Sequence, residues 1–255
     1  TTNFLRDIRS TELALVDRSH TDGDKHFVVP QQLLEQNAKL NEAQAKAGKP
    51  LEPLADPEGQ LPVSVTVLQY ERNATNRPLA KDEKPIATVG RGLKEGIKSL
   101  SAAKGTDNNS RADMGAAYVQ FKDKRSGENL GTFLLVQSIA EDTFSTQAEL
   151  DPKLEKVVHG DKSYIAALRF KRQYVPFTVN LVEARRDNYV GTATPRNYSS
   201  DVVLKDASSG VDSKVHIKMN DPLRYSGLTL YQSGHNELGG GVDYSTLAVV
   251  YNNGF

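Results

Sequence analysis

The sequence predicts a mainly β fold, built as an antiparallel β-sandwich or open barrel with long loop insertions and one or two short peripheral helices. Short runs of alternating apolar and polar residues follow one another from about residue 164 to the end of the 255-residue chain, with no helical periodicity between them. Only 38% of the residues are hydrophobic and the mean hydropathy is −0.52, so we expect part of the chain to be loop or solvated helix.

Charge and cysteine content exclude several classes of function. Lysine plus arginine and aspartate plus glutamate number 32 each, so the formal charge is zero and we expect no nucleic-acid partner. The chain has no cysteine, which excludes disulfides, thiolate nucleophiles, cysteine-ligated zinc and covalent haem attachment through this chain. No apolar run approaches the roughly 18 residues of a membrane span. Because the sequence starts with Thr1 and not with methionine, we expect a soluble fragment of a longer protein.

The first 72 residues predict strands and one helical insertion. Residues 11–18 and 26–29 favour two short strands around a polar turn. Pro30 suits the first position of a helix over residues 31–47, which Gly48 and Pro50 end. Its expected anchors are Leu33, Leu34 and Leu40, and a surface helix across a sheet edge is favoured over a partner-binding helix. Residues 63–70 alternate as a half-buried strand.

The middle of the chain predicts a long loop followed by a hairpin. Residues 73–113 have no regular pattern and are predicted as a long loop, disordered in part. Residues 116–123 and 130–137 predict a β-hairpin with Ser126 and Gly127 in its turn. Residues 149–161 then predict a turn and a short helix. We expect one domain over residues 1–255, divided into 1–72, 73–113 and a main sheet region at 114–255.

The remaining predicted strands lie at 164–172, 176–184, 199–205, 213–219, 227–233 and 244–251. The sequence VHIKMNDPLRYSGLTLYQSG, residues 215–234, predicts a cornered pair of strands. Val215, Ile217 and Met219 are expected on one dry face, because successive side chains of a strand leave opposite faces. Pro222 and Gly227 are expected to break and redirect the chain.

No catalytic constellation is visible. The five histidines lack metal-site spacing, and His235, between YQSG and ELGGG, is the best placed of them for a haem-iron contact. The chain has no G-x-S-x-G elbow, and Glu141 and Asp142 are neighbours that 32 acidic residues produce by chance. The basic run RFKR at 169–172 favours a solvated strand face over a basic and aromatic patch.

The sequence from KSYIAALRFKR to KVHIKMNDPLRYSGLTLYQSG resembles the extracytoplasmic domain of ResB-type proteins, which belong to the system II cytochrome c biogenesis machinery. TELALVDRS, VVPQQLL and LPVSVTV resemble that family more loosely. The resemblance depends on these positions: Arg169, Lys171, Arg172, Pro176, Phe177, Tyr189, Gly191, Thr192, Pro195, Arg196, Asn197, Ser200, Met219, Asn220, Pro222, Leu223, Tyr225, Gly227, Tyr231 and Gln232.

The resemblance implies a periplasmic domain, anchored to the cytoplasmic membrane by helices absent from this sequence. It implies a CcsA-type membrane partner, an apocytochrome c substrate with a Cys-x-x-Cys-His motif, and a thiol-reducing protein of the same pathway. Haem would be handled by the full-length complex and not bound stably by this chain. The histidines and the tryptophan-rich segment that handle haem in the family are attributed to membrane parts or to the partner. We therefore expect no enzyme activity, catalytic residue or metal site in this chain by itself.

The motif positions are interpreted as structural. Asn220 is expected to cap a turn that Pro222 sets, while Tyr225 and Tyr231 pack the strands against a second sheet. The leading hypothesis is a binding and scaffold module that receives apocytochrome, for example by strand addition at a sheet edge. The alternative is a periplasmic β-sandwich binding module or enzyme that acts on a small molecule or glycan. A third hypothesis places haem on His235 or Met219.

Overall fold

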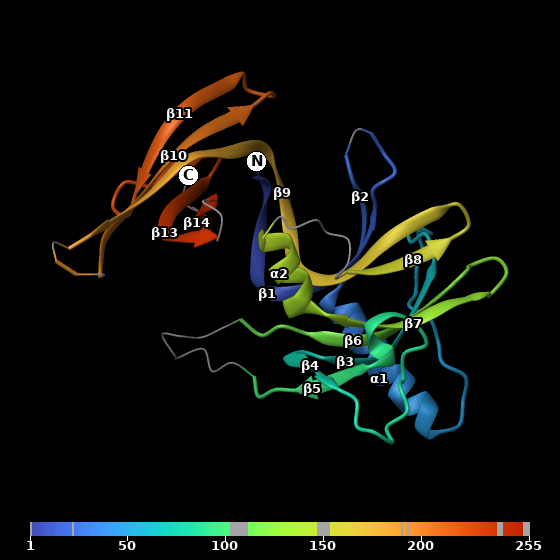
Figure 1. Ribbon diagram of the computed structural model, residues 1–255. Helices are drawn as coiled ribbons and strands as arrows, with labels where there is room; N and C mark the ends of the chain where they lie inside the picture. The colour runs from blue at the N-terminus through green and yellow to red at the C-terminus, as the bar shows by residue number, and fades with distance from the viewer. Residues whose placement is uncertain are drawn as a thin grey trace. The chain divides into compact units, whose positions relative to one another are not determined.

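The computed structural model describes residues 2–21, 23–102, 112–146, 154–189, 191–192, 194–238 and 242–251 (Figure 1). Strands dominate these residues, and the strand pairs are antiparallel. Two α-helices accompany them. The predicted fold class, mainly β and antiparallel with one or two peripheral helices, is confirmed.

Contacts group the chain into two compact units. The larger unit is Asp7–Lys171, and the smaller unit combines Thr1–Arg6 with Arg172–Phe255. The boundaries between the two units fall inside two long strands, β1 (Thr2–Asp17) and β9 (Lys162–Asn188). The single domain with regions at 1–72, 73–113 and 114–255 stays a prediction from the sequence. Each hydrophobic cluster of described buried residues lies within one unit, because each long strand contributes to one core before the boundary and to another after it.

The larger unit contains three sets of paired strands. Its elements besides β1 and β9 are β2 (Lys25–Pro30), α1 (Gln31–Lys46), β3 (Ser64–Glu71), β4 (Ala74–Pro78), the 3₁₀ helix η1 (Gly90–Leu93), β5 (Glu95–Ser99), β6 (Ala116–Lys122), β7 (Asn129–Val136), α2 (Gln137–Thr146) and β8 (Glu155–His159). Strand β2 pairs with β1 and β8 with β9, the order β3-β6-β7 forms a second sheet, and β4 pairs with β5. The predicted hairpin of residues 116–137 is therefore β6–β7.

Helix α1 packs through asparagines more than through the predicted leucines. Leu34 is fully buried, but Leu33 and Leu40 are each 41% exposed, so the prediction of three leucine anchors is wrong for two of them. Asn37 Oδ1 accepts the Val67 N–H at 2.8 Å, and Asn41 Nδ2 donates to the Val67 carbonyl at 3.0 Å. The helix covers the edge of β3, and edge backbone groups need polar partners. Pro30 is the N-cap and not the first helical residue.

Two predictions for the middle of the chain need correction. The long loop predicted at 73–113 contains β4, η1 and β5, while residues 103–111 lie outside the described part. Two hydrogen bonds hold the start of this segment. The Asn73 side-chain amide donates to the Ser101 carbonyl at 2.6 Å, and the Ala74 N–H donates to the Met114 carbonyl at 2.8 Å. The helix predicted within 149–161 is instead strand β8, with Val157 buried and Val158 62% exposed, the alternation of a half-covered strand.

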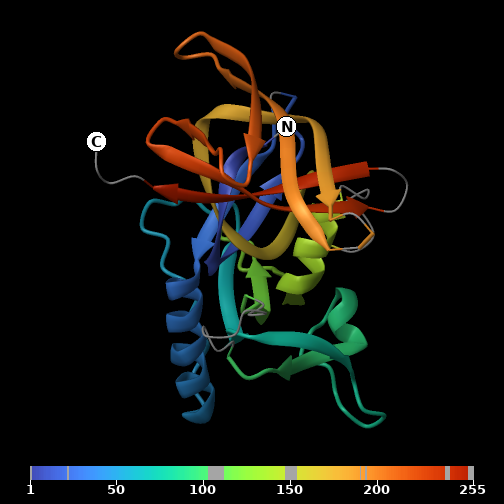
Figure 2. The same cartoon turned by 90° about the vertical axis from the view of Figure 1, so that its left-hand side faces the viewer.

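The smaller unit is a sandwich of two sheets. The end of β9 pairs with β10 (Pro195–Asp206), which pairs with β11 (Val211–Lys218). The second sheet has the order β12 (Leu223–Tyr225), β13 (Leu228–Leu238), β14 (Val242–Tyr251), and Figure 2 shows β13 and β14 in red running side by side. Both sheets contribute to one core: Phe177, Val202, Leu204, Ile217, Leu223, Leu228 and Leu230. The strands predicted at 164–172 and 176–184 are one strand, β9, that continues through Pro176.

Candidate functional site

A buried polar network joins strands of both sheets in the smaller unit. Ser200 Oγ, on β10, lies 2.8 Å from Gln232 Oε1 on β13 and 2.7 Å from Ser245 Oγ on β14. Gln232 Nε2 donates to the Gly234 carbonyl at 2.8 Å. Ser200 is 1% exposed and Gln232 is 4% exposed, so these groups satisfy one another away from bulk water. Two motif positions 32 residues apart thus meet in space, and their polar atoms are used internally.

Tyr225 anchors a second polar contact of the smaller unit. Its hydroxyl donates to Asp206 Oδ2 at 2.8 Å, and its ring packs edge-to-face on Phe177 with the centroids 5.1 Å apart. Hydrogen bonds from the Ser208 hydroxyl, and then from Tyr225, hold the pKa of Asp206 well below its usual range. Tyr231, expected to pack in the same way, is 38% exposed.

The turns around this motif are closed mainly by the backbone. Lys218 and Asp221 exchange two backbone hydrogen bonds of 3.0 and 3.2 Å across Met219 and Asn220. No hydrogen bond from the Asn220 side chain closes that turn within the described residues, in contrast to the predicted cap. Met219 is 45% exposed, because it lies in this turn and not on the dry face of β11.

The tight turn between β12 and β13 explains one motif glycine. Tyr225 pairs with Leu228, and the two residues between them, Ser226 and Gly227, have φ angles of 51° and 73°. A positive φ at both central residues is the conformation of a type I′ hairpin turn, and this turn type strongly favours glycine. Gly191 has φ 78° in the turn that joins β9 to β10. That turn is closed by the Tyr189 N–H, which donates to the Thr194 carbonyl at 3.0 Å.

The remaining motif positions around that turn are placed by the strand register. Asn197 on β10 pairs with Asp187 on β9, and Pro195 pairs with Asn188. Pro176 is exposed on β9.

The basic run RFKR is solvated only in part, because Lys171 is exposed while Arg169 is buried. Arg169 is 1% exposed, and its Nε donates to Glu12 Oε1 at 2.9 Å within the larger unit. His26 Nδ1 lies 3.4 Å from a terminal guanidinium nitrogen of Arg169. Arg172 belongs to the smaller unit, where its guanidinium carbon lies 4.2 Å from the centroid of the Phe4 ring. The run therefore divides between two units, and Arg169 is buried because Glu12 compensates its charge.

The described histidine side chains lie against charged partners. His20, His159 and His216 approach Asp17, Asp123 and Asp201 respectively, and His26 contacts Arg169. His235 pairs with Ser245 in the register of β13 and β14, and its side chain lies outside the described residues. Within the described part of the chain, no group of three or more histidine, aspartate or glutamate residues could hold a metal ion.

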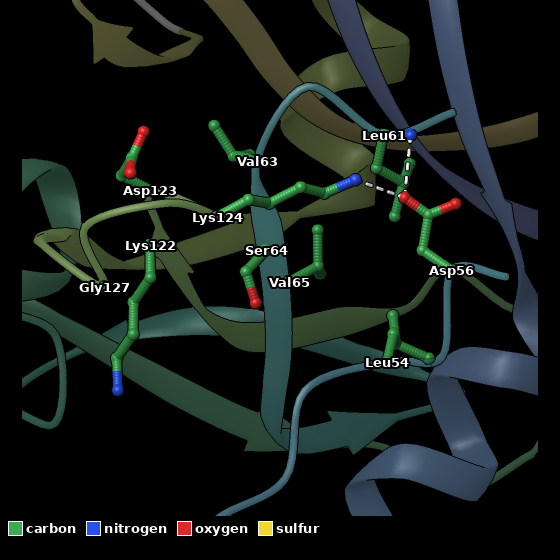
Figure 3. Close-up of a pocket in the computed structure, with 10 residues that line it drawn as sticks. All are labelled: Leu54, Asp56, Leu61, Val63, Ser64, Val65, Lys122, Asp123, Lys124 and Gly127. Carbon is green, nitrogen blue, oxygen red and sulfur yellow. Dashed lines mark hydrogen bonds and ion pairs between the residues drawn. The ribbon is translucent and has the colours of Figure 1, made fainter. Parts of the chain in front are cut away.

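A pocket of about 260 Å³ lies in the larger unit (Figure 3). Its apolar lining comes from Leu54, Leu61, Val63 and Val65. Figure 3 shows Lys124 extending across the pocket to Asp56, whereas Lys122 points in a different direction.

The two carboxylates that line the pocket are already engaged. A hydrogen bond from Lys124 lowers the pKa of Asp56, while hydrogen bonds from the Ser126 backbone and from His159 lower that of Asp123. Both carboxylates are therefore ionised at neutral pH, and neither is poised as a general acid.

The smaller unit is thus an antiparallel sandwich in which the motif residues Ser200, Gln232 and Tyr225 make internal hydrogen bonds. The model of the ResB-like family matches residues 139–252, which span α2 to β14 and make up less than half of the chain. The predicted resemblance to ResB-type proteins is confirmed over these residues, and it links this part of the chain to cytochrome c biogenesis. No curated protein matches the chain. In the described residues, no helix is both long enough and apolar enough to cross a membrane.

Proposed function

We propose that this chain is the extracytoplasmic, periplasmic part of a membrane-anchored ResB-type factor of system II cytochrome c biogenesis. In this role it is a binding and scaffold module that works with a CcsA-type membrane partner and a thiol-reducing protein, and it presents apocytochrome c for haem attachment. The supporting observation is that the match to the ResB-like family covers a sandwich whose motif residues Ser200, Gln232 and Tyr225 are engaged in internal contacts. Their roles are consistent with a scaffold, and catalysis is assigned to the complex.

The test is calorimetric titration of the purified chain with a reduced apocytochrome peptide that contains Cys-x-x-Cys-His. We expect binding in the micromolar range, since tethering to a membrane raises the effective concentration and weak affinity suffices. A peptide of the same length and charge without the two cysteines and the histidine serves as the comparison. If the peptide with Cys-x-x-Cys-His did not bind, apocytochrome presentation would be contradicted. The proposed role of the chain would then be limited to holding the membrane partner in place.

Haem itself is assigned to the full complex and not to stable binding by this chain. The four described histidine side chains are engaged with charged neighbours, which argues against a free axial ligand among them. Titration with haem, followed at the Soret band, should show no saturable shift. A saturable shift that His235→Ala or Met219→Leu abolishes would contradict this assignment.

A further inference from the structure

Sheet edges expose unpaired backbone groups, and proteins protect them with lysine, proline, short length or a covering segment. In the larger unit, the edge of β3 is covered. The two asparagines of α1 bond to Val67, and the Leu54 N–H donates to the Val65 carbonyl at 2.7 Å. The edge of β7 is covered in the same way, because the Thr88 N–H donates to the Thr132 carbonyl at 2.9 Å and Thr88 Oγ1 accepts the Thr132 N–H at 2.9 Å.

The other edge strands carry protective residues in their own sequences. Strand β12 is also only three residues long. The protecting residues are Lys25 and Pro30 on β2, Arg77 and Pro78 on β4, Lys98 on β5, Lys156 on β8, Lys214 and Lys218 on β11, and Arg224 on β12.

Strand β14 differs from all of these. It is the outer strand of the order β12-β13-β14, and its ten residues, VDYSTLAVVY, include one charged residue, Asp243 near the start, and no lysine, arginine or proline. Val250 and Tyr251 are 49% and 50% exposed, and Tyr231, whose partner in the register is Ala248, is 38% exposed. Among the described strands, β14 is thus a long and largely apolar edge strand, and its one strand partner in the sheet order is β13. Such an edge is suited to pairing with another strand.

The size of this edge favours a transient peptide over a second copy of the chain. A strand of ten residues is about 33 Å long and a sheet is about 10 Å thick, so pairing along β14 would bury about 330 Å² of each partner. A stable specific dimer needs at least about 1,200 Å² in total. Two copies joined only through β14 would fall well below that area, whereas a weakly held extended peptide requires no more.

We propose that the free edge of β14 receives an extended, uncharged or weakly charged segment of the apocytochrome polypeptide as an added antiparallel or parallel strand. This inference rests on the proposed function and assigns a surface to it. Recognition through main-chain hydrogen bonds admits many sequences, which suits a factor that must present different polypeptides around one short motif. The exposed residues Ala248 and Val250, which share one face of β14, then lie beside alternate residues of the added strand.

The test combines hydrogen–deuterium exchange with one pair of lysine variants. With the reduced Cys-x-x-Cys-His peptide bound, amides within Val242–Tyr251 should exchange more slowly, while those of β11 should not change. Ala248→Lys places a charge in the middle of the exposed β14 edge, and we expect it to weaken peptide binding at least about tenfold. Ser213→Lys adds the same charge to the exposed edge of β11 and should leave affinity within about twofold. Thermal melting checks that both variants are folded.

The outcomes separate this inference from the proposed function. If the peptide binds but the β14 amides are unchanged, or if Ala248→Lys binds as tightly as the parent chain, the edge assignment is overturned while apocytochrome presentation stands. Sedimentation that shows a concentration-dependent dimer abolished by Ala248→Lys would assign the edge to a second copy and overturn the peptide assignment. No peptide binding at all would contradict both proposals.

Discussion

At the scale of single residues, the network of Ser200, Gln232 and Ser245 shows how polar side chains can specify a sandwich. A buried hydroxyl that loses its partner costs more than an ordinary hydrogen bond contributes, because the remaining groups stay desolvated. The network also fixes the position of β10 relative to β13 and β14 of the facing sheet. If the two sheets shifted against each other, Gln232 would lose its hydrogen-bond partners. The motif serine and glutamine therefore act on the fold together.

Replacing Ser200 by alanine should lower the free energy of unfolding by about 1 to 3 kcal/mol, because Gln232 and Ser245 lose a buried partner. Ser213→Ala is the matched control on the adjacent strand, where the serine is exposed, and it should change stability by less than about 0.5 kcal/mol. Urea denaturation measures both. Equal effects for the two variants would show that the network does not stabilise the fold.

Asp17 predicts a pH dependence of the larger unit. Hydrogen bonds from the Ser19 hydroxyl and backbone N–H lower the pKa of Asp17 from 3.8 to about 2, and Lys162 adds a smaller favourable interaction. A folded-state pKa below the unfolded value gives stability that is present above pH 4 and is lost as the pH falls toward 2. In denaturation experiments at pH 5 and pH 3, Asp17→Asn should lose less stability on acidification than the parent chain. If Asp17→Asn and the parent chain lost the same stability between pH 5 and pH 3, Asp17 would not be a source of the pH dependence.

The sequence could not predict which charges are buried. RFKR has the composition of a solvated strand face, and the residue that changes this interpretation for Arg169 is Glu12, 157 positions away. The partners of Gln232 and Tyr225, Ser200 and Asp206, lie 32 and 19 positions away along the chain. By contrast, the positive φ of Gly227 depends on a local turn, so its bend could be predicted from the sequence.

At the scale of elements, α1 shows why helical apolar spacing is a weak guide when a helix covers a sheet edge. The helix was correctly predicted from its residue propensities and from the glycine and proline that follow it. The buried face of the helix was not predicted correctly. The backbone at the edge of β3 needs hydrogen-bond partners, and Asn37 and Asn41 supply them from the buried side of the helix. Leu33 and Leu40 lie at the margin of that face and are each 41% exposed.

The same substitution at two leucines of α1 tests this arrangement. Leu34→Ala removes a fully buried side chain and should cost about 2 to 5 kcal/mol of stability through lost burial and a cavity. Leu40→Ala, at a 41% exposed position, should cost less than about 1 kcal/mol. Chemical denaturation compares the two variants. A large loss for Leu40→Ala would show that this face of α1 is covered by another part of the protein.

At the scale of the whole molecule, alternation along the chain was enough to predict the mainly β class but not the grouping of strands into units. Strand β9 continues for 27 residues, and no break in its sequence marks the point where its side chains leave one core and enter another. Strands β3 and β6, on either side of residues 73–113, pair in one sheet of the larger unit although they are far apart along the chain. Grouping depends on contacts that only the folded chain defines.

The division of cores predicts that residues 7–171 fold without the rest of the chain. Three of the four hydrophobic clusters of described buried residues lie wholly within this continuous segment. The smaller unit is discontinuous, since Leu5 packs on its core and Phe4 stacks with Arg172.

Scanning calorimetry should therefore show one cooperative transition for a protein of residues 7–171, while residues 172–255 alone, without Phe4 and Leu5, should be markedly less stable than they are in the full chain. If residues 7–171 instead bind hydrophobic dye and melt without a transition, their core depends on the smaller unit. The two units would then have to fold as one cooperative structure.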